Sequence, residues 1–169
     1  MKASKTKSKA WFDQAILTYG DMLFDLCQSM LWSSVEAPYA YRSILRTIQR
    51  DGSSIDSRFQ KYERAWIFHI AYRELKKIAK KAPRSLTPAE QVMLDSNPDP
   101  KARLRHFDSY FHRLPIESQF LIILKDKYGI PIGEIASILE APEPSLKLQR
   151  SQSLRLLESW IWSGVDGLL

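Results

Sequence analysis

Residues 114–158 read LPIESQFLIILKDKYGIPIGEIASILEAPEPSLKLQRSQSLRLLE, and this stretch decides the fold of the C-terminal half of the chain. Its apolar residues recur every three to four positions, as they do on one face of a helix. The pattern predicts helices at about 115–127, 132–139 and 144–160, with Gly129 ending the first of them. A helix, a short helix, a four-residue turn and a longer helix form the order of a helix-turn-helix, whose last helix enters the major groove of DNA.

The rest of the chain also has a helical pattern. Alternating runs of Val, Ile and Thr are nearly absent, and no Asn-Gly or Asp-Gly turn joins two apolar segments. We expect helices at about 10–31, 36–50, 58–81 and 100–112. Four of the nine prolines, at positions 83, 88, 98 and 100, mark a linker, and Thr87 to Glu90 has the form of a capping box that starts a short helix within it. The sequence predicts an all-α protein with helical modules at 10–82 and 100–162, joined by a Pro-rich linker at 83–99.

Composition excludes several classes of protein. The 169 residues are 44% hydrophobic, which is enough to bury a core, and they carry a net charge of +6. The single cysteine, Cys27, and the three histidines have no spacing typical of a zinc or haem site, so we expect Cys27 to be a core residue. With six glycines, no nucleophile elbow and no phosphate-binding loop, the sequence predicts no enzyme, cofactor or small-molecule substrate.

The chain shows no pattern typical of export or membrane insertion. Residues 1–10 carry four lysines and then pass directly into an amphipathic pattern, without the apolar stretch of a secretory signal. The longest aliphatic run, residues 120–124, is far shorter than the roughly 20 residues that span a bilayer. We therefore expect a cytoplasmic protein. Its positive charge is compatible with nucleic acid, acidic protein or anionic lipid as a partner.

Four segments of the C-terminal half carry a family resemblance. Residues 114–119 read LPIESQ, 124–129 read LKDKYG, 133–139 read GEIASIL and 144–147 read PSLK. This stretch resembles region four of the bacterial extracytoplasmic-function sigma factors, where the family runs LPxxQ, LxDxxG, xEIAxxL and GTVKSRL with the same spacing. Residues 64–71, RAWIFHIA, resemble the family's RAWLYRIA segment of region two. The resemblance covers about residues 11–81 and 100–158, and it implies promoter DNA and core RNA polymerase as partners.

The chain departs from the family in the segment that docks on polymerase. Where the family has the acidic sequence DAEDLVQE, residues 36–43 read EAPYAYRS. Of the polymerase-docking positions Glu36, Tyr39, Arg42 and Ser43, only Glu36 keeps a carboxylate, and Arg42 adds a positive charge. Because missing or reversed charges lower the affinity of a complementary interface, we expect weakened docking on core polymerase. Two further departures are Glu140, at the family's turn glycine, and Gln149, at its recognition-helix arginine.

The last predicted helix has one face suited to duplex DNA. Residues 144–157 contain three basic side chains and no acid. Helical spacing places Arg150 within the apolar arc, so we expect its stem to pack on the core and its head to turn outward. Glutamine can pair with adenine, and a leucine can contact a thymine methyl group. The expected duplex-binding residues are Ser145, Lys147, Leu148, Gln149, Ser151, Gln152 and Arg155. An ordinary solvated helix face is the alternative.

The third predicted helix carries a basic stripe beside aromatic rings. Residues 58–84 contain nine basic and two acidic side chains. Cations beside exposed rings suit a single nucleic-acid strand, and the resemblance implies capture of the melted minus-ten strand at this helix and the loop before it. The expected strand-binding residues are Arg58, Lys61, Phe68, His69, Tyr72, Arg73 and Lys76. In the alternative, Phe68 and Tyr72 belong to the core and the lysines are only solvated.

These patterns together favour an extracytoplasmic-function sigma factor that directs promoter recognition and transcription initiation. Two alternatives stay open. One is a sigma-like mimic that binds an anti-sigma factor or another regulatory protein, which accounts better for the missing acidic patch. The other is a stand-alone helix-turn-helix regulator, which would dimerise on palindromic sites. Whether the sigma factor itself would be held by an anti-sigma factor is also open.

Overall fold

The computed structural model describes residues 2–31, 36–52, 63–81 and 87–163. Within these ranges the chain is all-α and contains no strand, which confirms the predicted fold class. The chain divides into two compact units: residues 1–82 with 133–140, and residues 83–132 with 141–169. Each unit is described by itself below.

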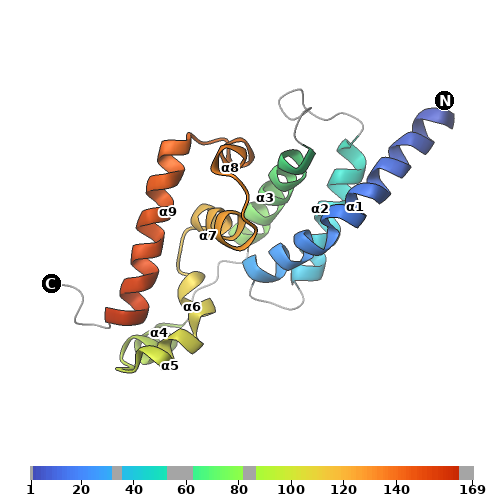
Figure 1. Ribbon diagram of the computed structural model, residues 1–169. Helices are drawn as coiled ribbons and strands as arrows, with labels where there is room; N and C mark the ends of the chain where they lie inside the picture. The colour runs from blue at the N-terminus through green and yellow to red at the C-terminus, as the bar shows by residue number, and fades with distance from the viewer. Residues whose placement is uncertain (1, 32–35, 53–62, 82–86, 164–169) are drawn as a thin grey trace. The chain divides into compact units, whose positions relative to one another are not determined.

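The first unit is built on three helices that lie against one another: α1 (Lys2–Met30), α2 (Glu36–Asp51) and α3 (Glu63–Lys81), as Figure 1 shows. The short helix α8 (Ile132–Leu139) completes this unit. Apolar residues on α2 follow the three-to-four spacing of one helical face and are all buried: Ala37, Ala40, Ile44 and Ile48. This face packs toward α1 and α3, so the opposite face of α2 is left to solvent.

Cys27 lies in the core of the first unit, as the sequence predicts. Its side chain is fully buried beside the other core residues of α1, such as Leu23 and Leu26. Burial raises the pKa of the Cys27 thiol to about 12, because the apolar surroundings disfavour the thiolate. The thiol is therefore a neutral packing group at physiological pH.

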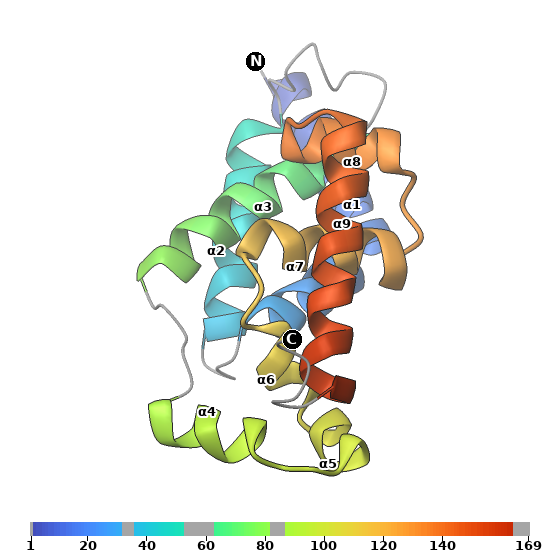
Figure 2. The same cartoon turned by 90° about the vertical axis from the view of Figure 1, so that its left-hand side faces the viewer.

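The second unit contains α4 (Pro88–Asp95), α5 (Pro100–Arg105), α6 (Phe107–Phe111), α7 (Ile116–Ile122) and α9 (Glu143–Glu158). Helix α7 continues as the π-helical turn η2 (Ile123–Lys127), and α9 continues as η3 (Ser159–Ser163). Helices α7 and α9 pack on each other (Figure 2). Phe120 and Leu121 of α7 and Leu124 of η2 are fully buried, and Leu146 and Leu157 of α9 are buried.

A buried arginine closes the end of η3. Arg103 is 3% exposed, and its Nε donates to the carbonyl oxygen of Ile161 at 2.6 Å. Its other nitrogens donate to the carbonyl oxygens of Asn97 and Trp162. The last carbonyls of a helix have no partner within the helix, so this guanidinium supplies donors that they would otherwise lack.

The ends of several helices follow their local sequence signals. Gly129 adopts a left-handed φ of 68°, and the amide of Ile130 donates to the Leu124 carbonyl at 2.9 Å, which closes the preceding helical turn as expected. The capping box of Thr87 and Glu90 at the start of α4 is also confirmed. In contrast, the single helix expected at 100–112 is divided into α5 and α6, because His106 leaves helical geometry with a ψ of 28°.

The two units differ from the expected domains in two segments. The described part of the expected linker, residues 87–99, belongs to the second unit, where the hydroxyl of Tyr110 donates to the Leu94 carbonyl and Arg113 pairs with Asp95. Residues 133–140, expected within the helix-turn-helix module, are grouped with the first unit. Two polar contacts, from Arg64 to Glu134 and between His69 and the Ile138 carbonyl, join α8 to α3.

Candidate nucleic-acid interface

Helix α9 separates its residues into a buried and an exposed side. Leu146, Ser153 and Leu157 are buried, at helical spacings of seven and four residues. Six of the seven residues expected to face duplex DNA are exposed: Ser145, Lys147, Leu148, Ser151, Gln152 and Arg155. The hydrophobic Leu148 is 59% exposed, so an apolar side chain stands among polar ones on this face.

The seventh expected residue is differently placed. Gln149 is half-buried, and its Nε2 donates to the hydroxyl oxygen of Ser118 at 3.0 Å. This contact fixes the amide against α7, within the second unit. Gln149 is thus placed to position α9, and a base contact from it would require this hydrogen bond to break.

Arg150 forms an ion pair instead of entering an apolar arc. Its Nε donates to Asp126 Oδ2 at 2.9 Å, and its Nη2 donates to the other oxygen of the same carboxylate. Both side chains are about one-third exposed, at 35% and 34%. The hydrogen bond to Asp126 raises the pKa of Arg150. Arg150 thus turns its guanidinium to Asp126, a partner that helical spacing cannot reveal, and the expected packing of its stem on the core stays a prediction.

The exposed side of α9 carries positive charge and no negative charge between its two ends. Since Asp126 neutralises Arg150, the basic groups left on it are Lys147 and Arg155, and residues 144–157 contain no acid. Exposed carboxylates stand at the two ends of the helix, on Glu143 and Glu158. Phosphate oxygens can approach the middle of this face without meeting a like charge.

The turn before α9 contains a strained residue. Glu140 has a φ of 53°, in the left-handed region that a side chain disfavours, and it stands at the position of the resembling family's turn glycine. The chain then reaches Pro142, whose carbonyl accepts the Leu146 amide at 3.1 Å and begins α9. The short turn between α8 and α9 thus keeps its left-handed backbone although it lacks the glycine.

The structure corrects the expected strand-binding stripe on α3. Phe68 is fully buried, His69 is 9% exposed and Tyr72 is 8% exposed, so none of these rings offers a face to an unpaired base. Arg73 is exposed, and the half-buried Lys76 donates to the Tyr72 hydroxyl at 3.3 Å. Arg58, Lys61 and most of the loop before α3 lie outside the described residues. The sequence prediction placed these rings wrongly because nearly every residue of 65–72 is apolar. The spacing of apolar residues there does not show which face of α3 is buried.

Two polar contacts of α3 were not predicted from the sequence. Arg64 donates two hydrogen bonds to the carboxylate of Glu134, at 2.7 and 2.6 Å. His69 Nδ1 lies 2.8 Å from the carbonyl oxygen of Ile138. Both partners are on α8, about 70 residues away in the chain, and no local pattern of residue types reports on a pairing over that separation.

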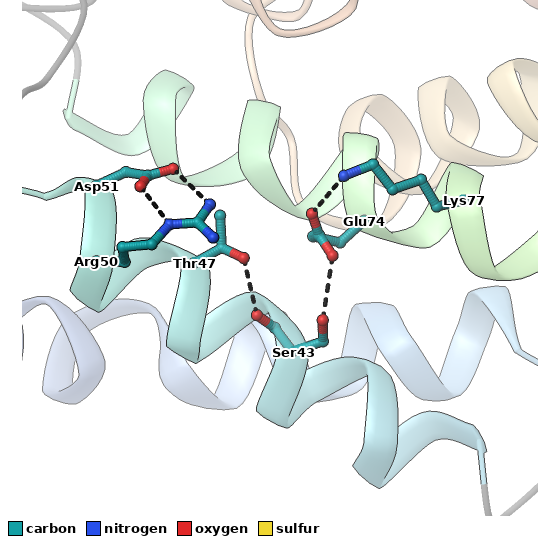
Figure 3. Close-up of polar contacts among 6 residues, drawn as sticks. All are labelled: Ser43, Thr47, Arg50, Asp51, Glu74 and Lys77. Carbon is teal, nitrogen blue, oxygen red and sulfur yellow. Dashed lines mark hydrogen bonds and ion pairs between the residues drawn. The ribbon is translucent and has the colours of Figure 1, made fainter.

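The positions expected to dock on polymerase lie on or beside the exposed side of α2. Tyr39 is 60% exposed and Arg42 is exposed, while Glu36 is half-buried. Ser43 is also half-buried, and its hydroxyl donates to Glu74 Oε2 on α3 at 3.1 Å (Figure 3). A tyrosine and an arginine therefore form the exposed part of this segment.

Two kinds of feature, a metal-binding cluster and a membrane-spanning helix, are not found in the described part of the chain. Among the residues that the structure describes, no group of three or more His, Cys, Asp and Glu side chains could hold a metal ion. No helix in the described ranges is long and apolar enough to cross a membrane.

No family model matches the chain, and no curated protein matches it.

Proposed function

We propose that this protein is a sigma-type promoter-recognition factor that reads duplex DNA with the exposed side of α9. The observation that carries the proposal is the acid-free stretch 144–157, in which Lys147 and Arg155 flank polar side chains on the exposed side. The resemblance of residues 114–147 to region four of the extracytoplasmic-function sigma factors supports the same assignment.

In the proposed mechanism, some residues of α9 supply affinity for DNA and others supply sequence specificity. Lys147 and Arg155 contact phosphates, which supplies a salt-dependent attraction that is independent of sequence. Gln152 offers an amide that can bind adenine with two hydrogen bonds, and Leu148 offers an apolar contact for a thymine methyl group. The protein catalyses nothing itself. It acts in the cytoplasm by bringing core RNA polymerase to the promoters that α9 selects.

Binding of the full chain to duplex DNA tests the DNA-reading side of the proposal. A duplex selected from a random pool is titrated by fluorescence anisotropy at several salt concentrations. Lys147→Ala and Arg155→Ala should each lower the slope of log affinity against log salt by about 0.9 for every phosphate that the variant no longer neutralises. Gln152→Ala should change the preference at one base pair by about 1 to 3 kcal/mol.

Two further variants show whether the face is correctly assigned. Lys101→Ala removes an exposed charge from α5 and should leave duplex affinity unchanged, so it is the matched control. Arg150→Leu should also have little effect on DNA binding, because Asp126 already engages that guanidinium. If Arg150→Leu abolished binding while Lys147→Ala did not, the opposite side of α9 would face DNA. Selection of a palindromic site bound by two copies would instead identify a stand-alone regulator.

A sigma-like mimic that binds a regulatory protein, such as an anti-sigma factor, is the second candidate. It is favoured by Tyr39 and Arg42, which are exposed where the resembling family carries an acid and an amide. Purified core RNA polymerase from the same cells distinguishes the two functions. If the protein is a sigma factor, polymerase should bind the full chain, and the double variant Tyr39→Asp with Arg42→Gln should strengthen the complex. Ser43 is left unchanged because a carboxylate there would face Glu74. Absence of both polymerase and duplex binding would favour the mimic.

A further inference from the structure

The exposed side of α2 carries a stripe of four long side chains. Tyr39, Arg42, Arg46 and Arg50 are all exposed, and their spacings of three, four and four residues keep them on one side of the helix. Four residues of helix rise about 6 Å, so the three guanidinium groups start at regular intervals. We call these four residues the α2 stripe.

The neighbouring helix α3 adds cations and holds α2 in place. Ser43 Oγ and Lys77 Nζ both donate to the carboxylate of Glu74, at 3.1 and 3.0 Å (Figure 3). Arg73 of α3 is also exposed, and its charge helps to lower the pKa of Asp51, after the stronger effect of the hydrogen bond from Arg50. The stripe is thus part of a fixed surface of the first unit.

The acids on this surface are already engaged. Glu74 pairs with Lys77, and Asp51 accepts two hydrogen bonds from Arg50. In contrast, Arg42, Arg46 and Arg73 form no ion pair with any residue in the described ranges. The surface therefore has an excess of positive charge that the fold itself does not use, and charge complementarity requires an acidic partner.

We infer that the α2 stripe binds an acidic α-helix of a protein partner. Carboxylates at every fourth position of such a helix repeat at the same interval of about 6 Å, so two of them can receive two-pronged contacts from Arg42 and Arg46, while Arg50 stays with Asp51. Tyr39 is 60% exposed at the end of the stripe and supplies an apolar ring, and tyrosine with arginine is typical of the residues that dominate protein interfaces.

The ends of the stripe favour a short helix over nucleic acid. Glu36 and Asp51, the first and last residues of α2, carry carboxylates, and that of Asp51 is 42% exposed. A nucleic-acid strand running along α2 would pass the Glu36 carboxylate at one end and the Asp51–Arg50 ion pair, which has no net positive charge, at the other. A helix of about three turns fits between them, because the 15 steps of α2 rise only about 22 Å. This inference does not depend on the proposed reading of DNA by α9.

A designed peptide pair tests the inference with the full chain. The probe is a fluorescein-labelled peptide of about 16 residues in an Ala- and Gln-rich helix, with Glu at every fourth position and one Leu on the same face of its central three turns. The control peptide has the same composition and charge, with its Glu residues spread around the helix. At about 100 mM salt, where exposed charges still attract, the matched peptide should bind at least about tenfold more tightly.

Variants then locate the binding surface. Arg42→Glu with Arg46→Glu should weaken binding of the matched peptide at least about tenfold. Lys101→Glu with Arg105→Glu makes the same change of charge at the same spacing on exposed residues of α5 and should have little effect. Tyr39→Ala should reduce binding of the matched peptide more than binding of the control peptide. Circular dichroism of each variant checks that the fold is retained.

Several results would overturn the inference. These are equal binding of the two peptides, equal losses of affinity in the α2 and α5 variants, or no binding of the matched peptide. A labelled single-stranded DNA of similar length is titrated in parallel. If the DNA binds more tightly than the matched peptide and its affinity falls in the Arg42 and Arg46 variant, the surface is a nucleic-acid site. Duplex binding through Lys147 and Arg155 is a separate measurement and would stand in either case.

Discussion

At the scale of single residues, left-handed backbone occurs at Gly129 and Glu140 among the described residues, and the two residues differ in conformational strain. Gly129, with a φ of 68°, has no side chain to strain. Glu140, with a φ of 53°, carries a side chain in a conformation that costs an L-residue about 1 to 2 kcal/mol. The turn before α9 is therefore a local source of instability.

Replacement of Glu140 by glycine should stabilise the protein. Relief of the left-handed strain exceeds the added flexibility of glycine in the unfolded chain, so we expect Glu140→Gly to raise the free energy of unfolding by about 0.5 to 1 kcal/mol. Gly129→Ala should lower the free energy of unfolding by about 1 kcal/mol. Apart from residue 129 itself and its two chain neighbours, no atom lies within 4 Å of the added methyl group at position 129, so that cost is backbone strain. Urea unfolding measures both, and destabilisation by Glu140→Gly would show that contacts of the glutamate side chain outweigh the strain.

At the scale of single elements, α4 shows how a local signal defines a helix end. Only Leu94 of this eight-residue helix is buried, so packing contributes little to its start. Glu90 Oε2 accepts hydrogen bonds from the Thr87 amide and hydroxyl, both at 2.8 Å, and the Glu90 amide donates back to the same hydroxyl oxygen at 3.3 Å. These reciprocal bonds satisfy donors that the first helical turn would otherwise leave open.

The capping box makes a prediction about pH. The hydrogen bonds from the Thr87 side chain and then its backbone amide lower the pKa of Glu90 below its ordinary value of 4.5. The carboxylate therefore stabilises α4 above that value, and its contribution is lost as the pH falls through the lowered pKa. Carbon-detected NMR titration of Glu90 should give a midpoint below 4.5, and Thr87→Val should move it upward. An unchanged midpoint in Thr87→Val would contradict the assigned cause.

At the scale of the whole molecule, α8 joins sequence-distant parts of the chain. Its sequence belongs to the stretch that resembles region four, yet its carboxylate and carbonyl meet Arg64 and His69 of α3. Glu134 has 15% of its side chain exposed and Arg64 has 38%. The hydrogen bond to Glu134 raises the pKa of Arg64, so the guanidinium keeps its charge.

Loss of this ion pair should loosen α8. We expect Glu134→Gln to lower the free energy of unfolding by about 1 kcal/mol, a figure already reduced for solvent screening of the half-exposed Arg64. Hydrogen exchange of the α8 amides in the full chain should become faster. Glu143→Gln removes an exposed carboxylate from α9 and is the matched control. Unchanged exchange in Glu134→Gln, or equal effects of the two variants, would show that the ion pair does not hold α8.

The amino-acid sequence by itself determined the helical class and most helix positions. The expected helix at 132–139 is α8, and the expected 36–50 is α2 with one further residue, because both contain short-range apolar periodicity and clear end signals. The exposed side of α9 was also predictable, apart from Gln149, since helical spacing sorts its residues into two sides. These features depend on residues within about four positions of one another, which a linear pattern records directly.

Only the tertiary structure decided which side chains are available for function. It buried Phe68, His69 and Tyr72, paired Arg150 with Asp126, and brought Glu134 to Arg64 across 70 positions of the chain. Burial and ion pairing depend on which helix covers which face, and a residue on an apolar stretch has the same local pattern whether its ring is covered or not. That choice is made by packing between distant segments, so it enters only when the helices assemble.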